Sequence, residues 1–177
     1  MEVVDRVDVN DNIIGQTTKE EAHKNGYIHR AAVVFCFNSE GKLLVQYRKK
    51  DGLLDCSVGG HVGQGEAYEA AAEREMKEEL GIVKGLKKVG IFYGDEITFR
   101  NQTIDHFFGF FEADLTVEDV KNINIEPKEV EKITPMSLEE IAKDMAKSPE
   151  KYTCGFMRTV NFYIEKNSLP IPLVEVK

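Results

Sequence analysis

The chain has 177 residues, 42% of them hydrophobic, which predicts one folded domain with a real core and excludes a disordered chain. Its formal net charge of −8 and pI near 5.1 argue against a long nucleic-acid groove, because such a groove needs a basic stripe. We expect a cytoplasmic protein, since no apolar run reaches membrane-spanning length, the first twenty residues lack a signal-peptide pattern, and the three cysteines form no CxxC pair.

Apolar periodicity and turn residues predict strands and helices that alternate irregularly along the chain. Strands are expected over residues 3–9, 13–17, 31–38, 42–48, 86–98, 103–113 and 130–136. Helices are expected over residues 19–24, 66–80, 138–147 and 150–166, and the tail from residue 169 should be extended. This order predicts a single α/β domain with a mixed sheet between helices. Residues 1–28 form its N-terminal hairpin and short helix, and residues 137–167 form its C-terminal helices.

The helix predicted over residues 66–80 contains neither proline nor glycine, and helix-favouring residues dominate it. Gly81 follows at the point where a left-handed residue would end the helix. Ala72, Met76 and Leu80 recur every fourth residue, so we expect this apolar stripe to face the core.

Three glutamates of this helix are spaced to share another face. Glu75, Glu78 and Glu79 stand at positions i, i+3 and i+4, and three carboxylates this close repel one another unless a cation lies between them. Hard oxygen ligands of this kind suit Mg²⁺ or Mn²⁺, which also bridge phosphates. The spacing therefore indicates a metal site on the helix.

A glycine-rich segment leads into the helix and separates it from an ordinary glutamate-rich surface helix. Residues 57–61 read as a strand that runs into a loop, and Gly63 and Gly65 keep the backbone open after it. Two adjacent glycines, Gly59 and Gly60, let backbone amides and carbonyls approach a metal ion or a phosphate closely. The loop and the helix together predict a metal–diphosphate site.

From Gly60 to Ile82 the chain reads GHVGQGEAYEAAAEREMKEELGI, and its fixed positions follow the spacing of the Nudix box. The chain therefore resembles the Nudix hydrolases. The resemblance implies an α/β/α sandwich with a mixed β-sheet and a catalytic loop-helix over residues 59–82. It also implies that Arg74 and Glu66 are an architectural pair that ties the loop to the helix.

The same resemblance assigns metal-binding roles residue by residue. Glu75, Glu78 and Glu79 match the metal-binding glutamates, with Glu79 the most direct ligand, and the carbonyl of Gly59 matches a backbone ligand of some relatives. It implies hydrolysis of a nucleoside diphosphate linked to another group, with Mg²⁺ or Mn²⁺ as cofactor. The metal ions activate the attacking water and neutralise charge on the leaving phosphate.

The general base stays open between a glutamate of the box and a residue of a later loop. Relatives place an extra base or ligand in such a loop, where this chain has Glu126, Glu129 and Glu131. We favour Glu129 among them, and Asp95 and Glu96 are the next candidates.

The N-terminal region resembles a particular branch of the superfamily, the one that includes type I isopentenyl-diphosphate isomerase. In that enzyme, histidines at about the places of His29 and His61 bind a metal, and a cysteine and a glutamate move the proton; His23 is offset by one residue. This chain has Gly59 at the position of that cysteine and His106 near the position of that glutamate. This chain therefore lacks both acid–base residues of the isomerase, and isomerase-like activity is kept as the alternative to hydrolysis. An inactive nucleotide-binding module is a second one, disfavoured because every metal glutamate is present.

Outside the box, basic side chains near predicted strands are candidates for substrate contacts. Arg30 and Arg48 are expected to bind phosphate, since guanidinium groups pair well with phosphate oxygens, and His29 and His61 are expected to bind substrate. His23 is expected to be structural. Aromatic residues that could stack on a base or fill the core are Tyr93, Phe99 and Phe107. The expected partner is a small diphosphate compound, without nucleic acid or membrane, and a homodimer is possible.

Overall fold

The structure is a computed structural model that describes residues 2–94, 97–99 and 102–176. Its strands are β1 (Val3–Val7), β2 (Ile13–Thr18), β3 (His29–Phe37), β4 (Leu43–Arg48), β5 (Leu54–Asp55), β6 (Val58–His61), β7 (Lys87–Tyr93), β8 (Ile97–Phe99), β9 (Gln102–Ile104), β10 (His106–Asp114) and β11 (Val130–Met136). Its helices are α1 (Lys19–Asn25), α2 (Tyr68–Leu80), α3 (Val117–Lys121), α4 (Leu138–Lys147), the 3₁₀ turn η1 (Pro149–Lys151) and α5 (Cys154–Lys166).

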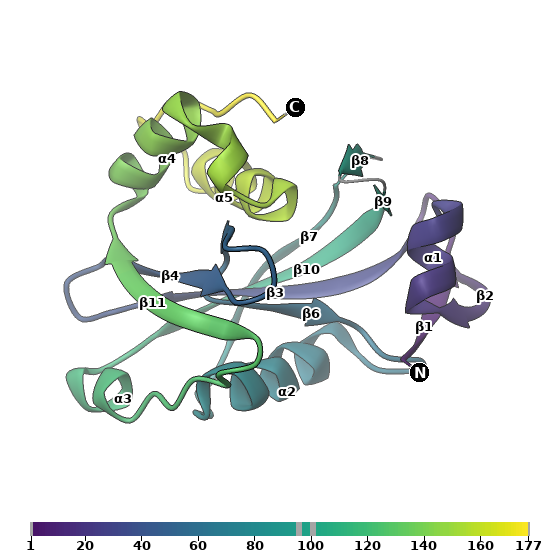
Figure 1. Ribbon diagram of the computed structural model, residues 1–177, viewed down its shortest axis with the longest axis horizontal. Coiled ribbons are helices and arrows are strands. Elements are labelled where there is room, and N and C mark those ends of the chain that lie inside the picture. The colour runs from purple at the N-terminus through teal and green to yellow at the C-terminus, as the bar shows by residue number, and fades with distance from the viewer. Residues whose placement is uncertain (1, 95–96, 100–101, 177) are drawn as a thin grey trace.

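The elements form three layers, with the sheet between two groups of helices. In Figure 1, α4 and α5 cover one face of the sheet and α2 and α3 lie against the other. The long central strand β3 pairs with β10 in parallel and with β1, β4 and β6 in antiparallel directions, so the sheet is mixed. The predicted α/β/α sandwich with a mixed sheet is confirmed.

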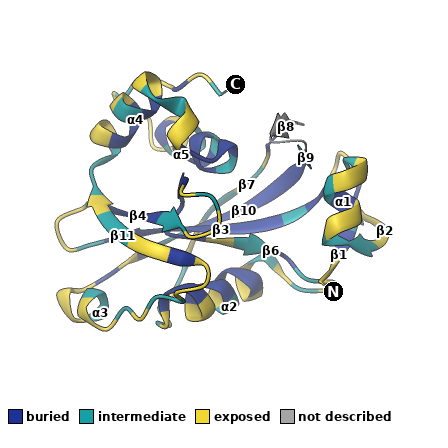
Figure 2. Cartoon of the chain, viewed as in Figure 1, coloured by how far each residue is buried: buried dark blue, intermediate teal, exposed yellow. Residues whose placement is uncertain are grey.

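Strand β3 separates two cores because its alternate side chains enter opposite faces of the sheet. Its odd-numbered side chains pack with α4 and α5, and its even-numbered ones pack with α2. The first set is Ala31, Val33, Phe35 and Phe37, and the second is Ala32, Val34 and Cys36. Figure 2 shows β3 and β10 buried along most of their length, which explains why both read as nearly continuous apolar runs.

Helix α2 has the apolar stripe and the C-terminal glycine cap that the sequence predicted. Ala72, Met76 and Leu80 are all buried against the second core, so the predicted stripe is confirmed. Gly81 ends the helix at φ 67° and its N–H donates to Lys77 O, as expected of a left-handed cap.

Two of the predicted elements are divided in the structure. The strand expected over 86–98 is separated into β7 and β8, and the strand expected over 103–113 into β9 and β10. Among the described residues, β8 and β9 pair with each other in a two-stranded sheet separate from the main one. The last helix begins at Cys154 rather than residue 150, since Thr153 caps it and the preceding Pro149 starts a 3₁₀ turn instead. Asp95 and Glu96 lie outside the described residues.

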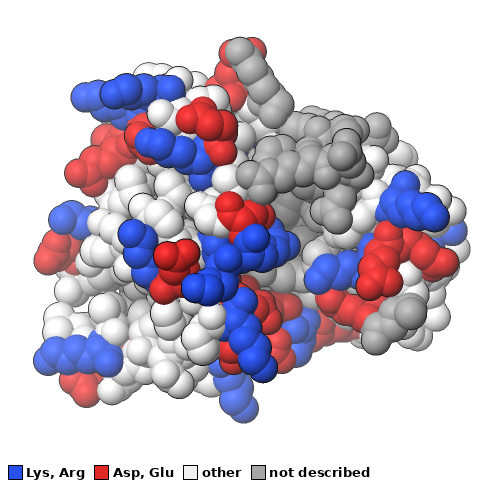
Figure 3. Space-filling model, viewed as in Figure 1, with Lys and Arg blue, Asp and Glu red and all other residues white. Residues whose placement is uncertain are grey.

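The surface and the thiols agree with the composition. Lys and Arg side chains are interspersed with Asp and Glu across the face drawn in Figure 3. Cys36, Cys56 and Cys154 are free and buried. Within the described ranges, none of the helices has both the length and the apolar character needed to cross a membrane.

Candidate functional site

Strand β6 and helix α2 build the loop-helix. Strand β6 pairs with β3 from Val58 opposite Val34 to His61 opposite Ala31, which fixes the loop above the central strand. Arg74 then ties the helix to the loop: its Nε and Nη2 each donate to Glu66 at 2.9 Å, and Glu66 also accepts the N–H of Gly63 at 2.8 Å. These bonds hold the pair in the architectural arrangement that the sequence suggested.

The three glutamates of the box divide between a buried pair and an exposed member. Glu75 and Glu79 are 9% and 5% exposed, whereas the side chain of Glu78 is 59% exposed. Arg74 Nη1 donates to Glu75 Oε1 at 2.6 Å and reaches Glu78 Oε2 at 3.4 Å, so one guanidinium spans both carboxylates. Glu75 and Glu79 are one helical turn apart and face β6, while Glu78 points to solvent.

Glu79 lies at the centre of the site. Its Oε2 accepts the side-chain N–H of Gln46 at 2.8 Å and the backbone N–H of Gly59 at 3.3 Å. Burial raises the pKa of Glu79 to about 8, against the lowering effect of the hydrogen bond from Gln46, and the nearby charge of Glu75 adds a smaller increase. Burial likewise raises the pKa of Glu75, against the effect of Arg74. Two buried carboxylates that lie close together and whose pKa values are both raised are suited to hold a cation.

Of the two glycines of β6, Gly60 is required by a close contact at the site, whereas a Cβ on Gly59 would meet only Val33 Cγ1 at an ordinary 3.6 Å. A Cβ on Gly60 would lie 2.1 Å from the carboxyl carbon of Glu75, so the glutamate occupies the space that a side chain would need. The backbone N–H of Gly59 donates a hydrogen bond to Glu79. That its carbonyl binds a metal stays a prediction.

Glu129, the favoured base, lies just before β11 on the same side as the box glutamates. Its carbonyl accepts the N–H of Lys49 at 2.7 Å, and its charge contributes to raising the pKa of Glu75. The side chain is exposed. Its position is compatible with the predicted role, which stays a prediction.

Both arginines expected to bind phosphate are engaged in ion pairs. Arg30 Nε donates to Asp11 Oδ1 at 2.6 Å, and Tyr68 donates to the same carboxylate at 3.1 Å. Arg48 lies 3.1 Å from Asp51 and 3.1 Å from Asp55. A phosphate would therefore compete with carboxylates at each arginine. Among the aromatic candidates, Tyr93 packs against Phe107 at 5.0 Å between ring centroids.

The structure brings all four histidines together. His23 on α1, His29 on β3, His61 on β6 and His106 on β10 each offer a nitrogen, and these four atoms lie within 4.8 Å of one another. His29 and His106 are buried and the other two are half-buried. Burial lowers the pKa of His29 to about 4 and those of the others below their ordinary value, so the cluster is neutral near pH 7.

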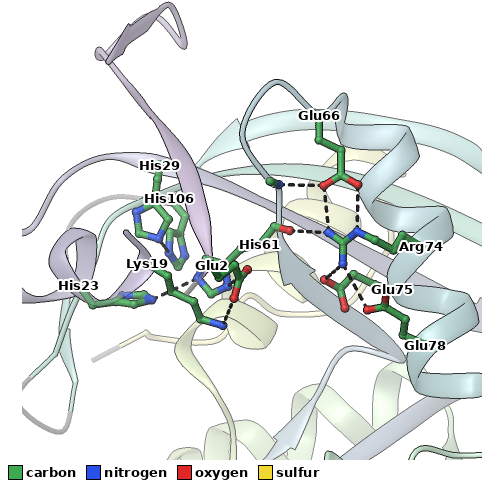
Figure 4. Close-up of polar contacts among 11 residues, drawn as sticks. Glu2, Lys19, His23, His29, His61, Glu66, Arg74, Glu75, Glu78 and His106 are labelled. Carbon is green, nitrogen blue, oxygen red and sulfur yellow. Dashed lines mark hydrogen bonds and ion pairs between the residues drawn. The ribbon is translucent and has the colours of Figure 1, made fainter. Parts of the chain in front are cut away.

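Figure 4 shows the histidine cluster beside Arg74 and its glutamates. Sequence reasoning assigned His23 to a purely structural role and did not establish the convergence, because the four residues come from four separate elements. It also missed Gln46, the hydrogen-bond partner of Glu79. It missed Lys19 and Lys50 as well, whose positive charges lower the pKa of His23. The available signal for Gln46 was a polar residue within an otherwise apolar predicted strand.

A model of the NUDIX domain family matches residues 27–156. The chain is 35% identical over 162 residues to a protein of Pectobacterium atrosepticum described as isopentenyl-diphosphate Delta-isomerase, with 86% of each covered. It is 41% identical over 85 residues to an uncharacterized Nudix hydrolase of Streptomyces coelicolor, which covers 45% of this chain and 47% of that protein. The crystal structure of DR0079 from Deinococcus radiodurans matches with a TM-score of 0.68 at 24% identity, over 82% of this chain and 90% of that one.

Proposed function

This chain belongs to the Nudix family, and from that membership we propose that it is a cytoplasmic enzyme that hydrolyses a diphosphate linkage in a small compound, such as a nucleoside diphosphate joined to another group. The cofactor of the proposed reaction is Mg²⁺ or Mn²⁺, held by Glu75, Glu78 and Glu79 with the carbonyl of Gly59. When bound at such a site, these ions lower the pKa of the attacking water and neutralise charge on the leaving phosphate.

The observation that carries the proposal is the buried pair Glu75 and Glu79 beside a glycine strand. Burying two carboxylates near each other costs free energy unless positive charge compensates them, and the raised pKa of Glu79 indicates that the side chains around it do not compensate it fully. A divalent cation would supply that charge. The donor set is made of hard oxygens, as Mg²⁺ requires.

Several residues of the chain position these groups. Gln46 and the N–H of Gly59 orient Glu79, and Arg74 orients Glu75. Glu129, whose charge acts on Glu75, is the residue that we propose accepts a proton from the attacking water. Because these partners are fixed before substrate binds, the site needs little reorganisation to reach its reactive arrangement.

An isomerase acting on an isoprenoid diphosphate is the second candidate, favoured by the 35% identity to the Pectobacterium protein along most of both chains. The residues that would move the proton argue against it. Gly59 has no side chain, and His106 stands near the place expected for the glutamate. Cys56, three residues earlier, is 1% exposed, and burial raises the pKa of its thiol well above the usual range.

The test measures phosphate and pyrophosphate release from a panel of diphosphate compounds with Mg²⁺ or Mn²⁺. We expect hydrolysis by the wild type and a loss of at least about a hundredfold in Glu79→Gln. Glu73→Gln is the matched control, because Glu73 is on the same helix but exposed, outside the site.

Isopentenyl diphosphate runs alongside and is analysed for a shifted double bond. Isomerised product without hydrolysis of any compound would replace the proposal with the second candidate. Binding of a nucleotide without turnover would indicate an inactive module.

A further inference from the structure

Strand β2 ends the main sheet without the charges or the proline found on the other end strands. Strands β2, β7 and β11 each pair with a single described strand. Strand β7 carries the exposed Lys87 and Lys88, and β11 carries the exposed Glu131, Lys132 and Pro135. Charges and prolines of this kind keep a sheet edge from pairing with another chain. Strand β2 reads IIGQTT and has neither.

Exposed apolar side chains gather on the same hairpin. Among the described residues, nine large hydrophobic side chains are exposed, and four of these belong to residues 3–14: Val3, Val9, Ile13 and Ile14. Ile13 and Ile14, on β2 itself, are 54% and 60% exposed. Figure 1 shows β2 at the end of the molecule away from α4. A cluster of exposed apolar side chains beside an unprotected edge indicates an interaction surface.

The backbone of β2 presents hydrogen-bonding groups on its outer side. The N–H of Lys19 donates to the carbonyl of Glu2 at 3.0 Å, and hydrogen-bonded pairs recur at every second residue of an antiparallel ladder. Gly15 therefore bonds to β1, whereas Gln16 turns its N–H and C=O away from β1. Ile14 is the extra residue of a bulge, without a partner in the register with β1.

This outer edge is complementary to itself. A two-fold axis at Gly15 places Ile14 opposite Gln16 of a second copy, and each of the two such pairs can exchange two hydrogen bonds. An axis at Gln16 would instead need the N–H of Thr18, which already donates to Glu21 Oε2 at 3.4 Å. The axis at Gly15 is therefore the one that uses the outward groups of both copies.

Side chains and charge favour the same arrangement. The two copies of Ile14 lie diagonally across the axis, about 7–8 Å apart, which is within reach of long side chains. On the other face, Ile13 lies opposite Thr17 of the second copy. The chain has a net charge of −8, so two copies repel each other in general, but β2 brings no like charges opposite one another.

We propose that two copies of this chain associate through β2, in antiparallel pairing about a two-fold axis at Gly15, so that the main sheet continues from one copy into the other. The occupant is a second copy because the edge matches itself both in its backbone groups and in its exposed isoleucines. The association is independent of the hydrolase proposed above, since β2 supplies none of the residues of that site.

The first experiment measures the mass of the full-length protein by analytical ultracentrifugation between about 1 and 200 μM. We expect a dimer in the wild type and at least tenfold weaker association in Ile14→Lys, which places two positive charges across the axis. Val117→Lys is the matched control, because Val117 is 57% exposed on α3, and it should associate as the wild type does. Circular dichroism checks that each variant is folded. A monomeric wild type over the whole range, or unchanged association of folded Ile14→Lys, would overturn the proposal.

The second experiment tests the axis by cross-linking Gly15→Cys with the mild oxidant diamide. A Cβ at Gly15 meets nothing within 4 Å, so the variant should fold. In the proposed pairing the two introduced thiols face each other with Cα atoms about 4.5 Å apart, within the range of a disulfide. The three native cysteines are buried and do not compete.

We expect Gly15→Cys to form a covalent dimer at least tenfold faster than Val9→Cys. Val9 is 70% exposed near the turn, and in the proposed pairing its two copies lie far apart, which makes it the matched control. Cross-linking of Gly15→Cys no faster than that of Val9→Cys would overturn the axis at Gly15, even if the wild type is a dimer.

Discussion

Replacing Gly60 with alanine would place a methyl group in the space that the carboxyl group of Glu75 occupies. The new Cβ would lie 2.1 Å from both the carboxyl carbon and Oε1 of Glu75, and 2.7 Å from its Cγ. An ordinary contact between such atoms is about 3.5 Å, so the carboxyl group must move by more than about 1 Å. That movement breaks the 2.6 Å bond from Arg74.

The costs in stability and in activity are expected to differ. The displaced group is the end of a flexible side chain, and its partner Arg74 is 37% exposed, so we expect a loss of only about 1 kcal/mol in the free energy of unfolding. A catalytic group misplaced by 1 Å costs about a hundredfold in rate, and we expect a loss of that size in diphosphate hydrolysis.

Denaturant unfolding and phosphate release measured on the same preparations separate the two effects. Gly85→Ala is the matched control, because a Cβ on Gly85 meets nothing within 4 Å. Wild-type hydrolysis and wild-type Mg²⁺ dependence in Gly60→Ala would refute the placement of Glu75 in the site.

Three further predictions concern ionisation and burial. Burial lowers the pKa of His29 from 6.5 to about 4, so between these values the unfolded chain holds a proton that the fold excludes. Glu79, whose pKa is raised to about 8, acts in the opposite direction, so His29 is isolated by comparison with a His29→Asn variant. In metal-free protein, acidification from pH 7 to 5 should lower the free energy of unfolding by about 2 kcal/mol more in the wild type than in His29→Asn, and the same pH dependence in both proteins would contradict this. Gln46→Leu removes the 2.8 Å hydrogen bond to Glu79, so the pKa of Glu79 should rise further. The Mg²⁺ concentration needed for half-maximal hydrolysis at pH 7 should then increase several-fold. An unchanged Mg²⁺ requirement would show that Gln46 does not position Glu79. Cys36, Cys56 and Cys154 are buried, and burial raises the pKa of each thiol, so thiol reagents should label the protein only after denaturation. Rapid labelling of the native protein would show instead that the cysteines are accessible.

Local spacing was enough to predict the loop-helix. Residues three and four apart on a helix are neighbours whatever the rest of the fold, so the sequence predicted the buried stripe, the cap at Gly81 and a cluster of glutamates on one side. The structure refined that cluster. Glu75 and Glu79 face β6 and are buried, whereas Glu78 lies on the solvent side of the same turn.

The partners of the predicted arginines were decided by the fold rather than by any pattern in the sequence. Arg30 pairs with Asp11 of the N-terminal hairpin turn, and Arg48 lies between Asp51 and Asp55. Either guanidinium could equally have faced solvent or a phosphate, because the sequence does not state which charged side chains a fold places opposite one another.

The sequence by itself determined the Nudix loop-helix and the order of strands and helices along the chain, since each depends on residues close together in the chain. Only the tertiary structure decided the histidine cluster. Strand pairing places His29 opposite His106 and Ala31 opposite His61, while helix α1 brings His23 to them. Shifting a strand by one residue would turn its histidine to the other face of the sheet. Register between distant strands is fixed by packing of the whole core, and for that reason the cluster could not be predicted from spacing alone.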